Sequence, residues 1–296
     1  MLILISPAKS LDLRSPAPDH QTTEPRMLDD TARLATIMAG KTSADLRTLM
    51  DVSEEIATLN VERYRNFQPG TPDEARPAAV TFNGAVYRGM EPHLFTTRDW
   101  TEAQKVLRIL SGLYGVLRPL DRIQPYRLEM GTALHTDRGS TLVDWWGERI
   151  RTLIEADLAE SPGAKVIVNL ASAEYFRPVK GIDAAVISPR FESRDRKGRW
   201  RVISFTAKTA RGLMAGWLVR NRVRIPGRPQ ELRRRLAIPR GRLHTRSSSV
   251  PQGGMTPGMQ GRPHQLRYMT WPSRGPDPQI ERMPGWGPAF LTLLHN

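Results

Sequence analysis

The sequence predicts an α+β fold, in which a single domain over residues 1–222 has a mixed central sheet wrapped by helices. Two observations favour this class. Segments with helical apolar spacing are interspersed with short, continuous apolar runs of the kind that buried strands show. Two of those runs, at residues 184–188 and 200–205, are separated by the turn-like Asp195-Arg-Lys-Gly198, which indicates a hairpin within the sheet.

The first part of the domain contains one predicted strand, a long loop and three predicted helices. Residues 2–5 form an apolar run that stops at Ser6-Pro7, which is typical of a buried strand. Residues 10–27 are rich in Pro, Asp, Ser and Thr and predict a loop. Helical spacing predicts helices that begin near Leu28, near Ser43 and after Asp51-Val-Ser-Glu54, followed by a linker at residues 69–77.

The remaining elements follow from the same signals. Residues 79–82 predict a short strand that the turn dipeptide Asn83-Gly84 closes. Thr101-Glu-Ala-Gln104 reads as a capping box, and the helix that it opens carries residues 106–110 and ends at Gly112. The pattern further predicts helices over residues 142–158 and 207–219 and strands over residues 165–170, 184–188 and 200–205.

The basic charge of the chain is concentrated at its end. The whole sequence has 44 Lys and Arg against 30 Asp and Glu, a net charge of +14. Residues 221–296 hold 13 Arg and three acidic residues, whereas residues 1–220 carry a net charge of only +4. The same final segment contains 11 Pro and 9 Gly, a density typical of low-complexity chain. We therefore expect residues 223–296 to be a disordered tail.

Composition excludes several kinds of site. The absence of cysteine excludes disulfides, thiolate metal sites and a cysteine nucleophile. The six histidines are scattered, and none has the i, i+4 spacing of a helical metal site, so we expect no metal and no cofactor. No apolar run approaches the ~20 residues that span a bilayer, and the apolar start is too short for a signal peptide. The expected location is the cytoplasm.

Ser6-Pro-Ala-Lys9 directly follows the first predicted strand. Ser-x-x-Lys is the spacing at which a lysine activates a serine nucleophile in penicillin-recognising enzymes, so Ser6 and Lys9 are candidate catalytic residues. The other two motifs of that class are absent. The alternative is a structural or anion-contacting lysine at a strand end.

A tight glycine turn, Gly112-Leu-Tyr-Gly115, suggests a phosphate contact. Such a turn after a helix exposes backbone N–H groups, as in the helix-hairpin-helix that binds DNA backbone without base specificity. The alternative is a helix C-cap with the turn's apolar neighbours in the core. The candidate DNA-binding residues are Arg108, Gly112, Tyr114, Gly115, Arg118 and Arg122.

A polar cleft is the second candidate site, because charged and polar residues recur at strand ends and element junctions, where ligand sites are commonly built. The candidate cleft residues are Lys9, Arg127, Glu129, Asn169, Ser172, Glu174, Lys208 and Arg211. As an alternative to DNA binding, an enzyme of unassigned reaction would use Ser6, Lys9, Glu129, Glu174, Lys208 and Arg211. A third interpretation makes these residues structural ion pairs.

Several of these segments together resemble the bacterial YaaA family of peroxide-stress proteins. The similar segments are residues 1–9, 107–121, 124–131, 169–172, 174–176, 204–205, 207–208 and 210–214. The resemblance implies a cytosolic protein that protects cells against hydrogen peroxide by holding down free iron, with a helix-hairpin-helix and DNA binding. It supplies no catalytic residue. The leading hypothesis is therefore a non-catalytic stress protein that binds DNA backbone.

The sequence departs from the family pattern at two places. The family's Phe-x-Gly-Asp-Val-Tyr appears here as Phe82-Asn-Gly-Ala-Val-Tyr87, with Ala85 at the position of the acid. Family members also end some 30–40 residues after the equivalent of Arg222 with an acid-rich stretch, whereas this chain becomes rich in Arg, Pro and Gly. We interpret the tail as the product of a frameshift near residues 223–226, which translation of the other two reading frames would test.

Overall fold

The computed structural model describes residues 1–194, 199–224 and 266–272, and within them one sheet organises the chain. The strand order is β4-β3-β1-β6-β7-β8, with β9 also paired to β7. The strands are β1 (Leu2–Ile5), β3 (Leu107–Ser111), β4 (Gly115–Leu117), β6 (Val166–Asn169), β7 (Ala185–Arg194), β8 (Trp200–Arg201) and β9 (Leu266–Pro272). β3, β1, β6 and β7 run parallel, while β4, β8 and β9 are antiparallel to their neighbours. The predicted mixed sheet is confirmed.

β1 lies at the centre of the sheet. Ile3 is paired with Leu107 of β3 on one side and with Val168 of β6 on the other. All four residues of β1 are fully buried, which explains why the strand reads as a continuous apolar run. Strands β2 (Arg76–Pro77) and β5 (Arg122–Ile123) form a separate small sheet.

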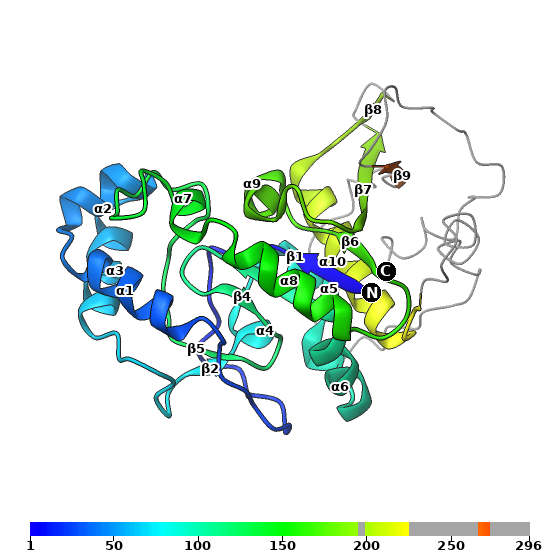
Figure 1. The fold of residues 1–296 in the computed structure, drawn as a ribbon, viewed down its shortest axis with the longest axis horizontal. Helices are drawn as coiled ribbons and strands as arrows, with labels where there is room; N and C mark the ends of the chain where they lie inside the picture. Colours follow the sequence, from blue (N-terminus) through cyan, green and yellow to red (C-terminus); the bar gives the residue numbers. More distant parts are fainter. Residues whose placement is uncertain (195–198, 225–265, 273–296) are drawn as a thin grey trace, which may run out of the picture.

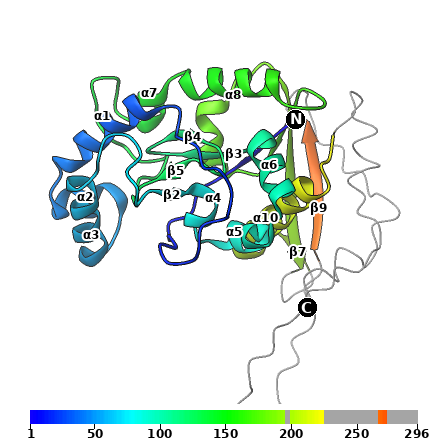
Figure 2. The same cartoon turned by 90° about the horizontal axis from the view of Figure 1, so that it is seen from below.

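Helices lie on both sides of the sheet and at one end of it (Figures 1 and 2). Figure 2 shows α7 and α8 above β3 and β4, with α4, α5 and α10 below them. The helices at the end of the molecule are α1 (Leu28–Ala39), α2 (Ser43–Met50) and α3 (Glu54–Arg65). The others are α4 (Ala78–Thr81), α5 (Ala85–Met90), α6 (Thr97–Val106), α7 (Leu142–Trp146), α8 (Arg149–Glu160), α9 (Ala173–Phe176) and α10 (Ser204–Arg220), with 3-10 turns at Pro92–Leu94 and Arg177–Val179.

The predicted helix starts in the first part of the chain are confirmed. The Thr42 side chain accepts a hydrogen bond from the Asp45 N–H, and Asp45 accepts one from the Thr42 N–H, which closes a capping box at α2. Ser53 caps α3 by accepting from the Ile56 N–H. These local signals are sufficient to place both helices.

Three predicted elements are wrong. Residues 79–82 belong to helix α4 and its C-cap instead of a strand, and Gly84 precedes α5. The predicted single helix over residues 142–158 is two helices, because Gly147, at φ +49°, ends α7. Helix α6 begins at Thr97, with Thr96 and Asp99 as its capping box, and ends at Val106.

The predicted helix-hairpin-helix is also wrong. Residues 107–111 continue from α6 as strand β3, and the glycine turn connects β3 to β4 as an antiparallel hairpin. Ser111 pairs with Gly115, whose φ of +66° favours glycine at that position. The two elements that flank the turn are therefore strands, and the geometry of a DNA-binding helical hairpin is not present there.

Close packing of α5 against α10 depends on glycine. A Cβ atom built on Gly212 would lie 1.9 Å from the carbonyl oxygen of Val86, and one on Gly89 would lie 2.4 Å from that of Thr209. Neither position accepts a side chain without a shift of backbone. The contact brings the N-terminal half of α10 against the segment that begins at Ala85.

Of the predicted tail, Val223, Arg224 and strand β9 fall within the described residues. β9 pairs with β7 from Ile187↔Pro272 to Ser193↔Leu266, so these seven residues form regular structure. The rest of the predicted disordered tail lies outside the described residues.

Candidate functional site

A cavity of about 350 Å³ opens where β1 and β6 end, at the carboxyl edge of the parallel strands. Ser6 directly follows β1, and Ser172 precedes α9 at the end of β6. Because parallel strands present their carboxyl ends at one edge, segments far apart in sequence meet there. We call this cavity the cleft. It is lined by Lys9, Arg127, Glu129, Glu174, Lys208 and Arg211 as its charged side chains, together with Ser6, Ser10 and Ser172.

The structure therefore brings together all six residues of the enzyme hypothesis. Of the wider set of predicted cleft residues, Asn169 alone does not line the cleft, and it lines a neighbouring cavity that shares Arg211 with it. Convergence in one concavity separates this set from ion pairs scattered through a core.

Ser6 is held by the residue that caps α9. The Ser172 N–H donates to the Ser6 Oγ at 2.9 Å, and the Tyr87 hydroxyl donates to the Ser6 carbonyl oxygen at 3.1 Å. Ser172 in turn caps α9 by accepting from the Tyr175 N–H. The Ser6 hydroxyl is thus positioned by the fold at the base of the cleft.

Lys9 does not have the arrangement of a base for Ser6. Its ammonium pairs with Glu129 at 2.9 Å and its side chain is 64% exposed. The hydrogen bonds of the Ser6 hydroxyl go instead to Ser172. A lysine that contacts a carboxylate and solvent in place of the serine hydroxyl is not positioned to accept the serine proton, so this geometry does not support the serine–lysine nucleophile.

Both carboxylates of the cleft already have partners. Glu129 lies 3.3 Å from Nη2 of Arg127 in addition to its pair with Lys9. Glu174 accepts a hydrogen bond from the Gly131 N–H at 2.8 Å. The Nε of Arg127 is buried and has no hydrogen-bond partner among the described residues.

In contrast to the two carboxylates, the cations Lys208 and Arg211 have no charged partner among the described residues. They lie one turn apart on α10, and within the described chain neither has an ion pair with a carboxylate. Burial lowers the pKa of Arg211, and no acidic neighbour opposes that effect. Because the reference pKa of arginine is above 12, the guanidinium remains charged at neutral pH. A partly buried cation without a counter-charge favours an anionic ligand.

Three tyrosines form the apolar wall of the cleft: Tyr87, Tyr126 and Tyr175. Burial raises the pKa of each one, so all three phenols are neutral at physiological pH. The Tyr126 hydroxyl lies 2.6 Å from the Ser111 Oγ, and that of Tyr87 bonds Ser6. These rings stabilise the wall and carry no charge into it.

The residues of the glycine turn lie in the interior. Gly112, Tyr114 and Gly115 are buried, and a Cβ on Gly112 would lie 2.3 Å from the Leu128 carbonyl oxygen. The Tyr114 N–H donates to Ser111 Oγ, and the Gly112 carbonyl accepts from the indole of Trp146. The interpretation of this turn as an exposed phosphate loop is therefore corrected: packing against the core covers it.

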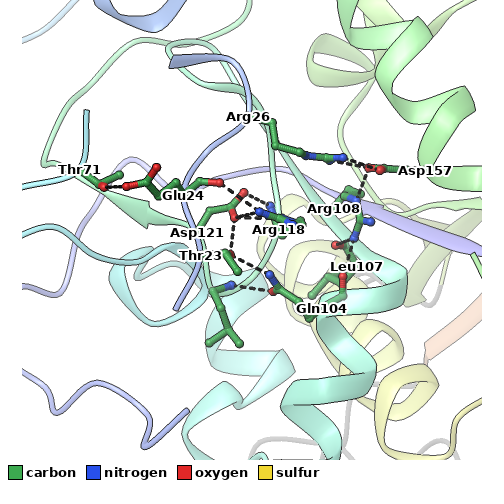
Figure 3. Close-up of polar contacts among 11 residues, drawn as sticks. Thr23, Glu24, Arg26, Thr71, Gln104, Leu107, Arg108, Arg118, Asp121 and Asp157 are labelled. Atoms are coloured by element: carbon green, nitrogen blue, oxygen red, sulfur yellow. Dashed lines mark hydrogen bonds and ion pairs between the residues drawn. The ribbon is translucent and has the colours of Figure 1, made fainter. Parts of the chain in front are cut away.

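The arginines near the turn are engaged in internal contacts, as Figure 3 shows. Arg108 is 5% exposed, and its Nε donates to Asp157 at 2.5 Å. Arg118 donates to Asp121 (Figure 3). The guanidinium of Arg122, which that figure does not label, donates to the Thr71 hydroxyl. Arg108 thus connects the hairpin to α8, Arg118 contacts the loop over residues 10–27 at Glu24, and Arg122 contacts the segment at Thr71.

Asp157 is the acid at the centre of that network, and sequence reasoning missed it. Arg26 and Arg108 approach its two carboxylate oxygens from opposite segments (Figure 3). Burial tends to raise the pKa of Asp157, but the hydrogen bonds from both guanidinium groups outweigh it and hold this pKa below its usual range. The role of this network is structural.

The residues that the structure describes hold no group of three or more His, Asp and Glu side chains placed to bind a metal ion. None of the helices described is long and apolar enough to cross a membrane.

The fold and the cleft define the class: an α+β protein whose mixed sheet ends at a polar cleft with an excess of cationic side chains. The chain belongs to the YaaA family of peroxide stress proteins, because the family's profile, described as "Peroxide stress protein YaaA", matches residues 1–235. Residues 236–296 lie outside that match. The frameshift hypothesis for the tail is not tested by it and stays a prediction.

Similar proteins carry the name UPF0246 protein. One from Alteromonas mediterranea is 47% identical over 226 residues, which covers 75% of this chain and 86% of the relative. One from Alcanivorax borkumensis is 45% identical over 231 residues, 77% of this chain and 89% of the relative. One from Burkholderia cenocepacia is 46% identical over 235 residues, 78% and 90% respectively.

Proposed function

We propose that this member of the peroxide-stress family acts through the cleft, which binds a small anionic ligand. The observation that carries this proposal is the state of Arg211. Its side chain is partly buried, lines the cleft, and has no carboxylate partner in the described chain. An uncompensated buried charge is costly, and an anion bound in the cleft would offset that cost.

The net charge of the cleft supports the same ligand class. Four cationic side chains and two carboxylates line it, for a net charge of +2. The carboxylate of Glu129 pairs with both Lys9 and Arg127, and that of Glu174 accepts a hydrogen bond from the Gly131 N–H. The positive charge that remains is contributed by Lys208 and Arg211, on one helix face.

Two finer functions rest on the family resemblance, and we propose that both use the cleft. The first is protection against iron-dependent oxidative damage. The second is DNA binding, for which the glycine turn no longer offers an accessible surface, since it is buried. A DNA contact would therefore use the cations of the cleft, with the salt dependence that phosphate contacts produce.

A survival assay tests whether the cleft carries the family function. A bacterial strain without its own family member would express the full chain, Arg211→Met, Arg122→Met or Arg47→Met, and would be challenged with hydrogen peroxide. Methionine keeps the apolar stem and removes the charge. Arg47 is an exposed residue paired with Glu54 and serves as the control.

We expect Arg211→Met to lose protection while Arg122→Met and Arg47→Met retain it. Circular dichroism and thermal unfolding of each purified protein establish that the variants are folded. Full protection by a folded Arg211→Met protein would overturn the proposal. Loss of protection in Arg122→Met alone would instead favour the surface beside the glycine turn.

A further inference from the structure

The cleft adjoins a second cavity. This second cavity has a volume of about 320 Å³, and Arg211 lines both. We call this second cavity the side pocket. A ligand whose charged group contacts Arg211 from the cleft therefore has room for a second part of its structure on the other side of the same guanidinium.

The lining of the side pocket differs from that of the cleft. Asn169 and Ser188 lie on neighbouring parallel strands, and the Asn169 amide donates to the Ser188 hydroxyl at 3.2 Å. The Asn169 carbonyl oxygen accepts from the Ala171 N–H, so among the described residues one amide proton of Asn169 has no acceptor and is available to a ligand. Besides the cations Lys180 and Arg190, of which Arg190 pairs with Glu192, the lining is apolar: Ala171, Ala173, Phe176, Pro189, Phe191, Val202 and Ala207.

The charge in the cleft specifies the kind of anion. Lys208 and Arg211 both lack a carboxylate partner in the described chain, so the pair complements two negative charges. A phosphate monoester carries between about 1.5 and 2 negative charges at pH 7. A phosphodiester carries a single charge per phosphate and matches the pair less well.

The side pocket specifies the rest of the ligand. Apolar surface with two aromatic rings, Phe176 and Phe191, suits a flat ring that stacks, as bases stack on aromatic side chains in other proteins. The free amide proton of Asn169 suits a ring that carries a hydrogen-bond acceptor. A heteroaromatic ring meets both conditions, whereas a purely aliphatic body meets neither.

We propose that the cleft and the side pocket together bind a phosphate monoester of a flat heteroaromatic group, of the size of a nucleoside monophosphate. The phosphate contacts Lys208 and Arg211, and the ring lies in the side pocket beside Phe176 and Asn169. This inference rests on the proposed function of the cleft as an anion site and adds the ligand class.

Calorimetric titration of the purified full chain with four probes tests the inference. The probes are inorganic phosphate, ribose 5-phosphate, adenosine and adenosine 5′-monophosphate, which separate the charged group from the ring. We expect the nucleoside monophosphate to bind at least about tenfold more tightly than ribose 5-phosphate, and adenosine to bind more weakly than either phosphate ester.

Variants locate the two parts of the ligand. Phe176→Leu keeps an apolar side chain and removes the ring, and Asn169→Ser removes the free amide donor. Both variants are expected to abolish the preference for the nucleoside monophosphate and to leave the affinity for inorganic phosphate unchanged. Arg211→Met is expected to weaken the binding of inorganic phosphate, ribose 5-phosphate and adenosine 5′-monophosphate. Arg47→Met is expected to leave the affinity for all three unchanged.

The outcomes separate this inference from the proposal on which it rests. Phosphate binding that depends on Arg211, with no preference for the nucleoside monophosphate over ribose 5-phosphate, would overturn the side-pocket inference alone. A preference that survives in both side-pocket variants would also overturn it. Phosphate binding that Arg211→Met leaves unchanged, or no binding of any probe, would overturn the anion-binding cleft as well.

Discussion

The ammonium of Lys9 lies 2.9 Å from a carboxylate oxygen of Glu129, and this ion pair decides how charge is distributed in the cleft. Glu129 also contacts Arg127, so one acid faces two cations. The other acid, Glu174, is hydrogen-bonded to the backbone at Gly131. Positive charge consequently remains at Lys208 and Arg211.

Removing the Glu129 charge should strengthen anion binding. Glu129→Gln raises the net charge of the cleft by one, so we expect the affinity for inorganic phosphate to rise by about fivefold at low salt and less at high salt. We expect a loss of about 1–3 kcal/mol in the free energy of unfolding, because the largely buried Arg127 also loses its carboxylate partner. Calorimetric titration at two salt concentrations measures the effect.

Glu148→Gln is the matched control, since Glu148 is exposed, pairs with Arg151 and does not line the cleft. The control should bind phosphate as the unmodified protein does. Weaker phosphate binding in Glu129→Gln would contradict the charge distribution described above.

Restoring the acid of the family pattern should act in the opposite direction. Ala85 lines the cleft at the first residue of α5, and Ala85→Asp would lower the net charge of the cleft by one. We expect the affinity for inorganic phosphate to fall by about fivefold. The exposed substitution Ala44→Asp in the first turn of α2 is the control and should leave the affinity unchanged. An unchanged affinity in Ala85→Asp would show that this side chain does not face the bound anion.

The glycine contact between α5 and α10 should be required for the position of Arg211. Gly212→Ala places a methyl group against the Val86 carbonyl oxygen and must push the helices apart. We expect a loss of at least about 2 kcal/mol in the free energy of unfolding, together with weaker phosphate binding. Gly40→Ala, where the nearest atom would lie at 3.6 Å, should be close to neutral. Urea unfolding of both variants measures the difference, and equal stability would contradict the close approach.

Asp157 should stabilise the fold strongly through Arg26 and Arg108. Asp157→Asn leaves the buried guanidinium of Arg108 without its counter-charge, which in comparable buried pairs costs about 3–5 kcal/mol. The exposed pair of Arg33 with Asp137 is the control, and Asp137→Asn should cost less than about 1 kcal/mol. Similar midpoints for the two variants in urea would contradict a structural role for Asp157.

The stabilisation by Asp157 should depend on pH in one direction. Because the pKa of Asp157 is lower in the folded protein than in the unfolded chain, the folded state binds fewer protons at this group. Its contribution is complete above the unfolded pKa of about 4 and is lost as the pH falls further. The difference in stability between the protein and Asp157→Asn should therefore be constant from pH 7 to 5 and shrink below pH 4. A difference that grows on acidification would have the wrong sign.

The cleft was predictable from sequence to a large extent, and the reason is the geometry of parallel strands. Ser6 and Ser172 follow strands that read as apolar runs, and strand ends of one direction meet at one edge. From that rule alone, the residues that follow the predicted strands 2–5 and 165–170 can be assigned to a common site. Lys208 and Arg211 follow from their place at the start of a predicted helix after the last strand.

The glycine turn shows where the same reasoning fails. Residues 106–110 are apolar at positions that suit both a helix and a strand, and a short run does not distinguish them. Pairing with Ile3 and Leu4 in β1 decides the outcome, and this pairing joins residues about a hundred positions apart. The partner of Arg108 is also distant in the sequence, since Asp157 lies 49 positions further on in α8, so the pattern near the turn does not distinguish a buried structural arginine from a phosphate contact.

The central claim is that Arg211 holds an anion in the cleft, and titration of the full chain with inorganic phosphate tests it most directly. We predict saturable binding that is weakened by at least about tenfold in Arg211→Met and is unchanged in Arg47→Met. Equal phosphate affinity in the protein and in a folded Arg211→Met variant would contradict the claim.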